Sequence, residues 1–88
     1  MAFLDSSGAD FSQIATSANA EGLLELGLIY ATGRTGETDL VSAHKWFNIA
    51  AYRGCAAAKT RREEVAAEMT REEIAAAQRA ARDWITSH

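Results

Sequence analysis

Two residues in the middle of the chain, His44 and Cys55, have side chains that could act as a nucleophile, a general base or a soft metal ligand. We expect His44 near the start of a helix and Cys55 just beyond the end of the same helix. Their eleven-residue separation then places them about 16 Å apart along the helix axis. That distance is too great for a catalytic dyad or a shared metal ion. We therefore predict a partly exposed helix residue at His44, a small junction residue at Cys55, and neither an enzyme nor a metal site.

The segment LGLIYATGRTGETD, from Leu26 to Asp39, contains two glycines, Gly33 and Gly36, that could belong to a phosphate-binding loop. A Walker-type loop needs a lysine directly after its last glycine. Here Glu37 follows Gly36, and its charge would repel phosphate. The dinucleotide-binding fingerprint also fails, because it needs a third glycine and a preceding strand. We interpret the segment as a connection between two helices and predict no cofactor.

A second group with potential acid–base chemistry is a set of carboxylates in the later half of the chain. These residues alternate with arginines and are Glu63, Glu64, Glu68, Glu72 and Glu73. Acid–base catalysis needs a carboxyl group that is positioned in a cleft. Charges that alternate along a sequence are typical of solvated helix faces. We therefore predict no catalytic residue among them.

The composition indicates an all-α protein of one domain. The 88 residues include no proline and six glycines, and alanine is abundant while β-branched residues are few. This balance favours helices over strands. Alanine buries little area, so the hydrophobic content of 48% overstates the size of the core.

Charge and cysteine content exclude several classes of protein. A net charge of −3 argues against nucleic acid as a partner. No stretch approaches the ~18 apolar residues that span a membrane, and the N-terminus shows no signal-peptide pattern. The single cysteine fits a reducing compartment. We predict a cytoplasmic protein that does not act at a membrane.

The charges are distributed unevenly along the chain. Met1 to Ala43 contains six acidic residues against Arg34 alone, whereas His44 to His88 contains eight basic residues against six acidic ones. Such asymmetry could steer head-to-tail self-association or an encounter with a partner. The alternative interpretation is that these are ordinary solvated helix faces.

Helix boundaries follow from capping residues and hydrophobic spacing. Residues 1–16 show no sustained period and are expected to be an N-terminal tail. The first helix begins near Ser17 or Asn19 and runs to about Ala31. Gly33 follows as a left-handed C-terminal cap, because glycine adopts that conformation without a Cβ penalty.

The second helix has Asp39 as its N-cap, with Thr38 as the alternative, and ends at Gly54. A third helix spans about 56–68 and has only a thin apolar stripe. The fourth begins with a capping box formed by Thr70 and Glu73. The apolar face of the fourth helix consists of Ile74, Ala77, Ala81, Trp84 and Ile85. We predict two antiparallel helical hairpins, over residues 17–58 and 59–88.

The spacing in the first hairpin resembles that of the Sel-one-like repeat, an α-helical relative of the tetratricopeptide repeat. The matching positions are Leu26, Gly27, Tyr30, Gly33, Asp39, Ala43, Trp46, Phe47, Ala50, Ala51, Gly54 and Ala58. The sequence departs from the pattern at Thr35-Gly36, where the family has Gly-Val, and at Gly22, where it has alanine. The resemblance covers one repeat and implies a fragment of an α/α solenoid that the last hairpin caps.

The matching positions have a physical rationale. Gly27 opposite Ala43, Ala50 or Ala51 would let the two helices approach closely. Tyr30 and the aromatic pair Trp46-Phe47 would supply the bulk that alanine lacks. Stacked repeats usually need about three units for independent stability. We therefore expect self-association into a homo-oligomer.

The resemblance implies a non-catalytic protein-interaction module, a small bacterial adaptor or scaffold whose helical groove holds a peptide or a partner helix. Leu24 and Leu28 remain on the first helix to face such a groove or a second subunit. The alternative is that the N-terminal tail or the last hairpin covers them.

The final residues RDWITSH suggest a second function. Bacterial ATP-dependent proteases and their adaptors read exposed apolar termini, so Trp84, Ile85 and His88 could form a recognition element. This would make the protein a regulatory adaptor or a substrate of such a protease. The opposing interpretation is that Trp84 and Ile85 complete the buried stripe of the fourth helix, which leaves only residues 86–88 free.

Overall fold

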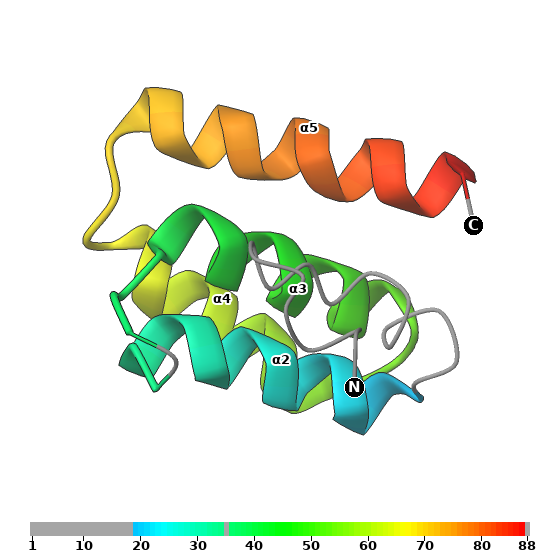
Figure 1. Cartoon of the computed structure of the whole chain (residues 1–88). Helices are drawn as coiled ribbons and strands as arrows, with labels where there is room; N and C mark the ends of the chain where they lie inside the picture. Colours follow the sequence, from blue (N-terminus) through cyan, green and yellow to red (C-terminus); the bar gives the residue numbers. More distant parts are fainter. Residues whose placement is uncertain (1–18, 35, 88) are drawn as a thin grey trace, which may run out of the picture.

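The computed structural model describes residues 19–34 and 36–87 of the chain. Its helices are α2 (Ala20–Thr32), α3 (Leu40–Tyr52), α4 (Ala56–Ala66) and α5 (Arg71–Ser87), as Figure 1 shows. The described part contains no strand, which confirms the all-α prediction. The predicted tail, residues 1–16, and the predicted recognition residue His88 lie outside the described residues.

Helix α2 begins and ends at its predicted caps, and α3 begins at its predicted cap. The Asn19 side chain accepts a hydrogen bond from the Gly22 N–H at 2.8 Å, so α2 starts there. Gly33 ends α2 with a φ of 72°, and its N–H donates to the Ile29 carbonyl. The Asp39 carboxylate accepts from the Ser42 N–H at 3.0 Å and thereby caps α3. Local chemistry is sufficient to place these boundaries.

The boundaries of the later helices differ slightly from the predictions. The α3 helix ends at Tyr52, and Gly54 adopts a φ of 105° in the turn that follows. The predicted capping box of α5 is present: the Glu73 N–H donates to Thr70 Oγ1 at 3.0 Å, and the Thr70 N–H donates to Glu73 Oε1 at 2.9 Å. The α4 helix ends at Ala66, earlier than predicted, and its N-cap Cys55 makes no side-chain capping bond.

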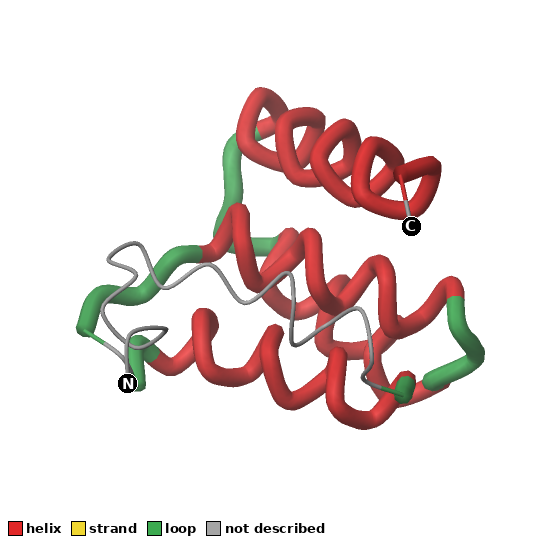
Figure 2. The backbone as a smooth tube through the Cα atoms, turned by 45° about the vertical axis from the view of Figure 1, so that its right-hand side comes forward, coloured by secondary structure: helices red, strands yellow, loops and turns green. Residues whose placement is uncertain are grey.

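Successive helices run in alternating directions, and α3 occupies the centre of the bundle (Figure 1). Helices α2, α4 and α5 all pack on α3. In Figures 1 and 2, α5 lies on one side of the group formed by the other three helices. Helices α4 and α5 run antiparallel to each other. Each of them packs mainly on α3, and they have little contact with each other. The thin apolar stripe of α4 accounts for this, since Ala58 is its one buried residue.

The core is built around α3. Its buried apolar residues are Leu23, Leu26, Ala43, Trp46, Phe47, Ile49, Ala50, Ala58, Ala81 and Trp84. The Phe47 ring lies against Gly27, where a Cβ atom would overlap it. Close approach of α2 and α3 therefore depends on this glycine, but the side chain that it faces is Phe47, whereas the spacing predicted Ala43, Ala50 or Ala51. The partly buried Tyr30 and Ala51 pack around the same core.

Two tryptophans join α5 to α3. The rings of Trp46 and Trp84 meet edge to face, with centroids 5.6 Å apart and an interplanar angle of 76°. Such edge-to-face pairs are favourable beyond the area that they bury. Ala77 and Ala81 lie on the same buried face of α5. The predicted apolar stripe of the last helix is thus its docking face.

Candidate protein-interaction site

His44 is buried, with only 3% of its surface exposed, so the prediction of a partly exposed residue was wrong. It lies one turn before Asn48, which accepts a hydrogen bond from Arg62 of α4 at 2.6 Å. Burial and then the nearby Arg62 charge lower the pKa of His44. Its Nδ1 atom has no hydrogen-bond partner in the described part of the chain. His44 is therefore a neutral core residue at pH 7.

Cys55 is partly buried at the junction of α3 and α4, as predicted. Within residues 19–34 and 36–87, no group of three or more histidine, cysteine, aspartate or glutamate side chains is arranged to hold a metal ion.

The four described residues of the predicted partner-binding set contribute to the core. Leu24, Leu28 and Ile85 are partly buried and pack against the buried cluster. Trp84 is 6% exposed and belongs to that cluster. Trp84 therefore completes the buried stripe of α5. The sequence also allowed the alternative that Trp84 belongs to an exposed recognition element, and the structure does not place it there. Beyond Ile85, the described residues of α5 are Thr86 and Ser87, and both are exposed.

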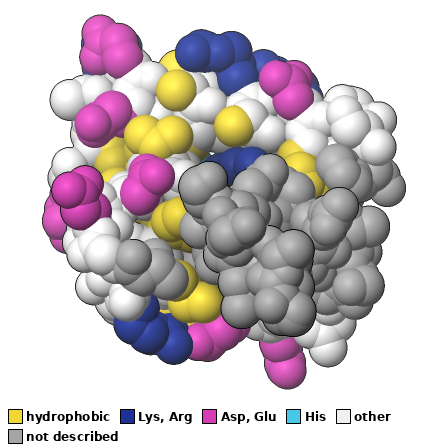
Figure 3. Space-filling view, viewed as in Figure 1, with side chains coloured by type: hydrophobic (Ala, Val, Ile, Leu, Met, Phe, Trp, Pro, Cys, Tyr) yellow, Lys and Arg dark blue, Asp and Glu magenta, His cyan; other side chains and the backbone are white. Residues whose placement is uncertain are grey.

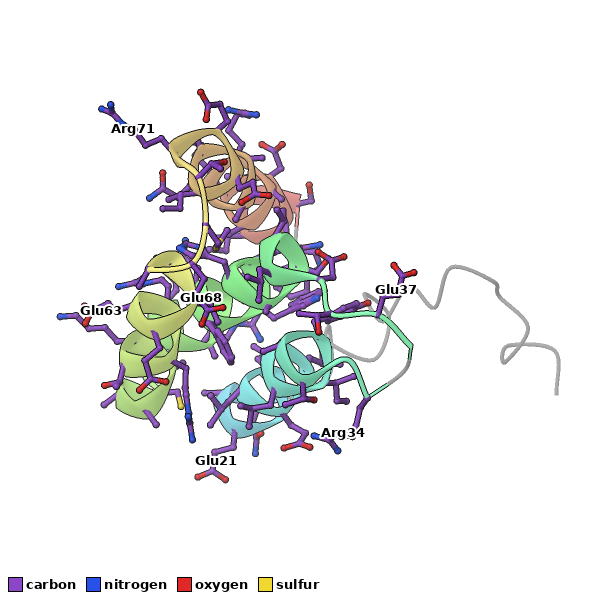
Figure 4. All side chains as sticks on the ribbon, turned by 90° about the vertical axis from the view of Figure 1, so that its left-hand side faces the viewer. Glu21, Arg34, Glu37, Glu63, Glu68 and Arg71 are labelled. Carbon is purple, nitrogen blue, oxygen red and sulfur yellow. The ribbon has the colours of Figure 1, made fainter. Side chains whose placement is uncertain are left out.

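An open hollow of about 530 Å³ lies at one end of the bundle. Five segments meet there: the end of α2, the α2–α3 loop, the start of α3, the α4–α5 connection and the start of α5. The lining residues are Tyr30, Glu37, Thr38, Asp39, Leu40, Val41, Glu68 and Glu73. Figure 4 looks onto this end and shows Glu37 and Glu68 on opposite sides of α3. We call this feature the end hollow.

The end hollow combines apolar and negatively charged side chains. Tyr30, Leu40 and Val41 are partly buried and supply apolar surface, while all four carboxylates belong to exposed residues. In Figure 3, aspartate and glutamate side chains gather on the left, the side on which Figure 1 places this end. Negative charge around an apolar surface favours a ligand that is both cationic and apolar.

Two of the four carboxylates in the end hollow are held by helix starts. Asp39 accepts hydrogen bonds from the Ser42 N–H at 3.0 Å and from the Ser42 hydroxyl at 2.8 Å. Glu73 accepts from the Thr70 N–H. The capping geometry therefore fixes these charges, whereas Glu37 lies in the loop and Glu68 in the α4–α5 connection.

The sequence did not predict this hollow as a site. Asp39 was recognised only as a capping residue, Glu68 only as part of a charged face, and Glu73 as both. The one available signal was the excess of acid before Ala43, to which Glu37 and Asp39 contribute. Glu68 and Glu73 join them only because α4 and α5 both pack on α3.

No known protein family, no curated protein and no solved structure matches this chain. The similarity to the Sel-one-like repeat therefore remains a prediction from residue spacing. No helix in the described part of the chain has the length and apolar character that crossing a membrane requires.

Proposed function

We propose that this protein is a non-catalytic protein-interaction module that binds a polypeptide segment in its end hollow. The observation that carries the proposal is the combination of Tyr30, Leu40 and Val41 with four carboxylates in one open depression. Apolar contacts of this kind supply binding energy, and a charged rim supplies orientation and specificity. In this proposal the protein is a small bacterial adaptor or scaffold that works in the cytoplasm.

The exposure and the hydrogen bonding of the four carboxylates favour a binding role over a catalytic one. A general acid or base is usually held in a desolvated cleft that adjusts its proton affinity. Glu37 and Glu68 are exposed, and Asp39 and Glu73 are engaged in capping. The hollow is also open, whereas small-molecule sites enclose most of the ligand surface.

A second candidate function is that of a regulatory adaptor or substrate of an ATP-dependent protease. The observation that favours it is the exposure of Thr86 and Ser87 at the end of α5. Because Trp84 is in the core, the recognised segment would have to begin after it. The partner would then contact the end of α5 and not the end hollow.

Site-specific photo-cross-linking in host cells tests the two candidates. The photoreactive residue p-benzoylphenylalanine replaces Val41 in the end hollow, Leu28 on α2, or Thr86 at the end of α5, in otherwise intact chains. Gln78, which is exposed on α5, serves as the control position for random encounters. Each product is identified by mass spectrometry.

We expect a discrete adduct with another protein from position 41 that exceeds the background at position 78. Adducts confined to position 86 would contradict the hollow and favour recognition through the tail. Adducts confined to position 28 would move the binding surface to α2, where the sequence placed it. An adduct from position 41 with twice the mass of the chain identifies a second copy as the partner.

A further inference from the structure

Tyr52 is the large apolar side chain that the described part of the chain leaves exposed, with 70% of its surface accessible. It lies at the C-terminal end of α3, and Arg53 follows it directly. The Arg53 guanidinium lies over the Trp84 ring, 5.4 Å from its centroid. Exposed aromatic residues beside arginine are typical of interface anchors. The Trp84 ring therefore holds a cation beside an exposed aromatic side chain.

Exposed basic side chains lie at the end of the bundle that carries Tyr52. Figure 1 shows that the end of α3, the start of α4 and the end of α5 lie at this end, away from the end hollow. The exposed cations on these segments are Arg53, Lys59 and Arg82. The exposed acids nearest this end in the described sequence are Glu21 and Asp83. Among the described residues the three cations outnumber these two acids by one charge, whereas the lining of the end hollow has four carboxylates and no lysine or arginine.

We propose that the end hollow receives the Tyr52-Arg53 end of a second copy of this chain. This inference rests on the proposed function, because it names the partner of the same hollow. The aromatic ring of Tyr52 would lie against Leu40 and Val41, and the Arg53 guanidinium would lie among the carboxylates. Each molecule carries both halves of the contact, so charge complementarity and the exposed ring select a second copy as the occupant.

The geometry requires a head-to-tail contact. Asp39 and Tyr52 bound the opposite ends of α3, a helix of 13 residues that is about 20 Å long. The two complementary surfaces therefore lie at opposite ends of the molecule. Such a heterologous contact leaves one hollow and one Tyr52 end free in every open assembly, so growth beyond a dimer is expected.

The contact is expected to be weak. An end-on contact between two such small bundles buries less than the ~1,600 Å² of a standard stable interface. Exposed charges contribute little individually and are screened within about 10 Å at 0.1 M salt. Association should therefore depend on both protein concentration and ionic strength.

Sedimentation equilibrium of the purified full-length chain tests the inference. At about 50 mM NaCl we expect the weight-average mass to rise above the 9.5 kDa monomer as concentration increases, and at about 500 mM NaCl we expect it to fall back. A wild-type chain that stays monomeric at millimolar concentration and low salt would overturn the proposal.

Two charge-reversal variants make the test specific to the two ends. Arg53→Glu damages the Tyr52 end and leaves the hollow intact, whereas Glu68→Arg damages the hollow and leaves the Tyr52 end intact. Each variant alone should remain monomeric. An equimolar mixture should form dimers and stop there, because only one of the two possible contacts has wild-type surfaces on both sides.

Arg79→Glu is the matched control, since it makes the same charge change in the middle of α5 and should associate like the wild type. Tyr52→Ser is a second test that leaves the Arg53–Trp84 contact in place. It should weaken association at least tenfold. Circular dichroism confirms that each variant is folded.

A mixture that stays monomeric, or an equal loss of association in Arg79→Glu, would contradict the head-to-tail contact. A monomeric wild type that still cross-links to another protein from position 41 would overturn this inference and leave the proposed function standing. Self-association through the two ends, with only self-adducts from position 41, would support the contact and contradict the adaptor role.

Discussion

The imidazole of His44 is buried in the core, and the proposed function does not use it. Its surroundings disfavour the charged form, because burial removes water from the ring and Arg62 adds a repelling charge. A buried nitrogen without a hydrogen-bond partner also costs stability. The sequence pattern alone did not reveal this burial, since histidine is intermediate between the residue types that are usually buried and those that are usually exposed.

We predict that this histidine makes the stability of the protein depend on pH. The unfolded chain binds a proton at His44 near the ordinary value of 6.5, whereas the folded chain does so only at lower pH because its pKa is lowered. The free energy of unfolding should therefore be at its full value above pH 6.5 and fall as the pH drops below it. The slope from this one group is at most about 1.4 kcal/mol per pH unit.

Urea denaturation at about pH 7.5 and about pH 5.5 measures this loss. His44→Leu fills the same region without a titratable group and should show a flatter dependence over that range. If the two proteins lost stability equally, the effect would belong to the carboxylates and not to His44.

At the scale of the helix, short-range capping decides where α2, α3 and α5 begin. Asn19, Asp39 and Thr70 each accept a hydrogen bond from a backbone N–H that the helix itself cannot satisfy. These signals lie within three residues of each boundary, which is why they could be predicted from sequence. The end of α4 was predicted less accurately, because no cap marks it and the apolar stripe is thin.

We predict that Thr70→Ala lowers the free energy of unfolding by about 1 kcal/mol, because the Glu73 N–H loses its acceptor. Thr70→Ser retains the hydroxyl and should be close to neutral. Urea denaturation followed by circular dichroism measures both. An equal loss in both variants would mean that the methyl group of Thr70, not its hydroxyl, stabilises the start of α5.

At the scale of the whole molecule, α3 is the common partner of the other helices. Helix α5 depends mainly on one interface, formed where Trp84, Ala77 and Ala81 pack against α3. Helix α3 is covered on several sides and contributes more buried residues than any other described helix. Regions with fewer buried contacts open more readily in the native state.

Native-state hydrogen exchange should therefore show the slowest amides in α3 and faster exchange in α5. Trp84→Ala should cost about 3–5 kcal/mol of stability and raise exchange in α5 more than in α2. Tyr52→Ser, which changes an exposed residue, should leave the exchange pattern unchanged. Protection in α5 equal to that in α3 would show that the bundle opens only as a unit.

The sequence alone determined the features of this protein that arise from short-range chemistry. Helix propensity, the caps at Asn19, Asp39 and Thr70, and the left-handed turn at Gly33 each depend on residues a few positions apart. The apolar period also placed Trp84 on the buried stripe of α5. These signals were sufficient for an all-α fold with four predicted helices, and the structure confirms each of them in the residues that it describes.

Only the tertiary structure decided which surfaces come together. The end hollow brings together Glu37 and Glu68, thirty-one positions further along the chain. His44 is buried one turn before Asn48, to which Arg62 of α4 donates a hydrogen bond. Both outcomes depend on the packing of α4 and α5 against α3. The contact between Trp46 and Trp84 joins α5 to α3, and the thin apolar stripe of α4 gives α5 little surface to pack on. Periodicity identifies the face of a helix that will be buried, but it does not specify the helix that will cover it.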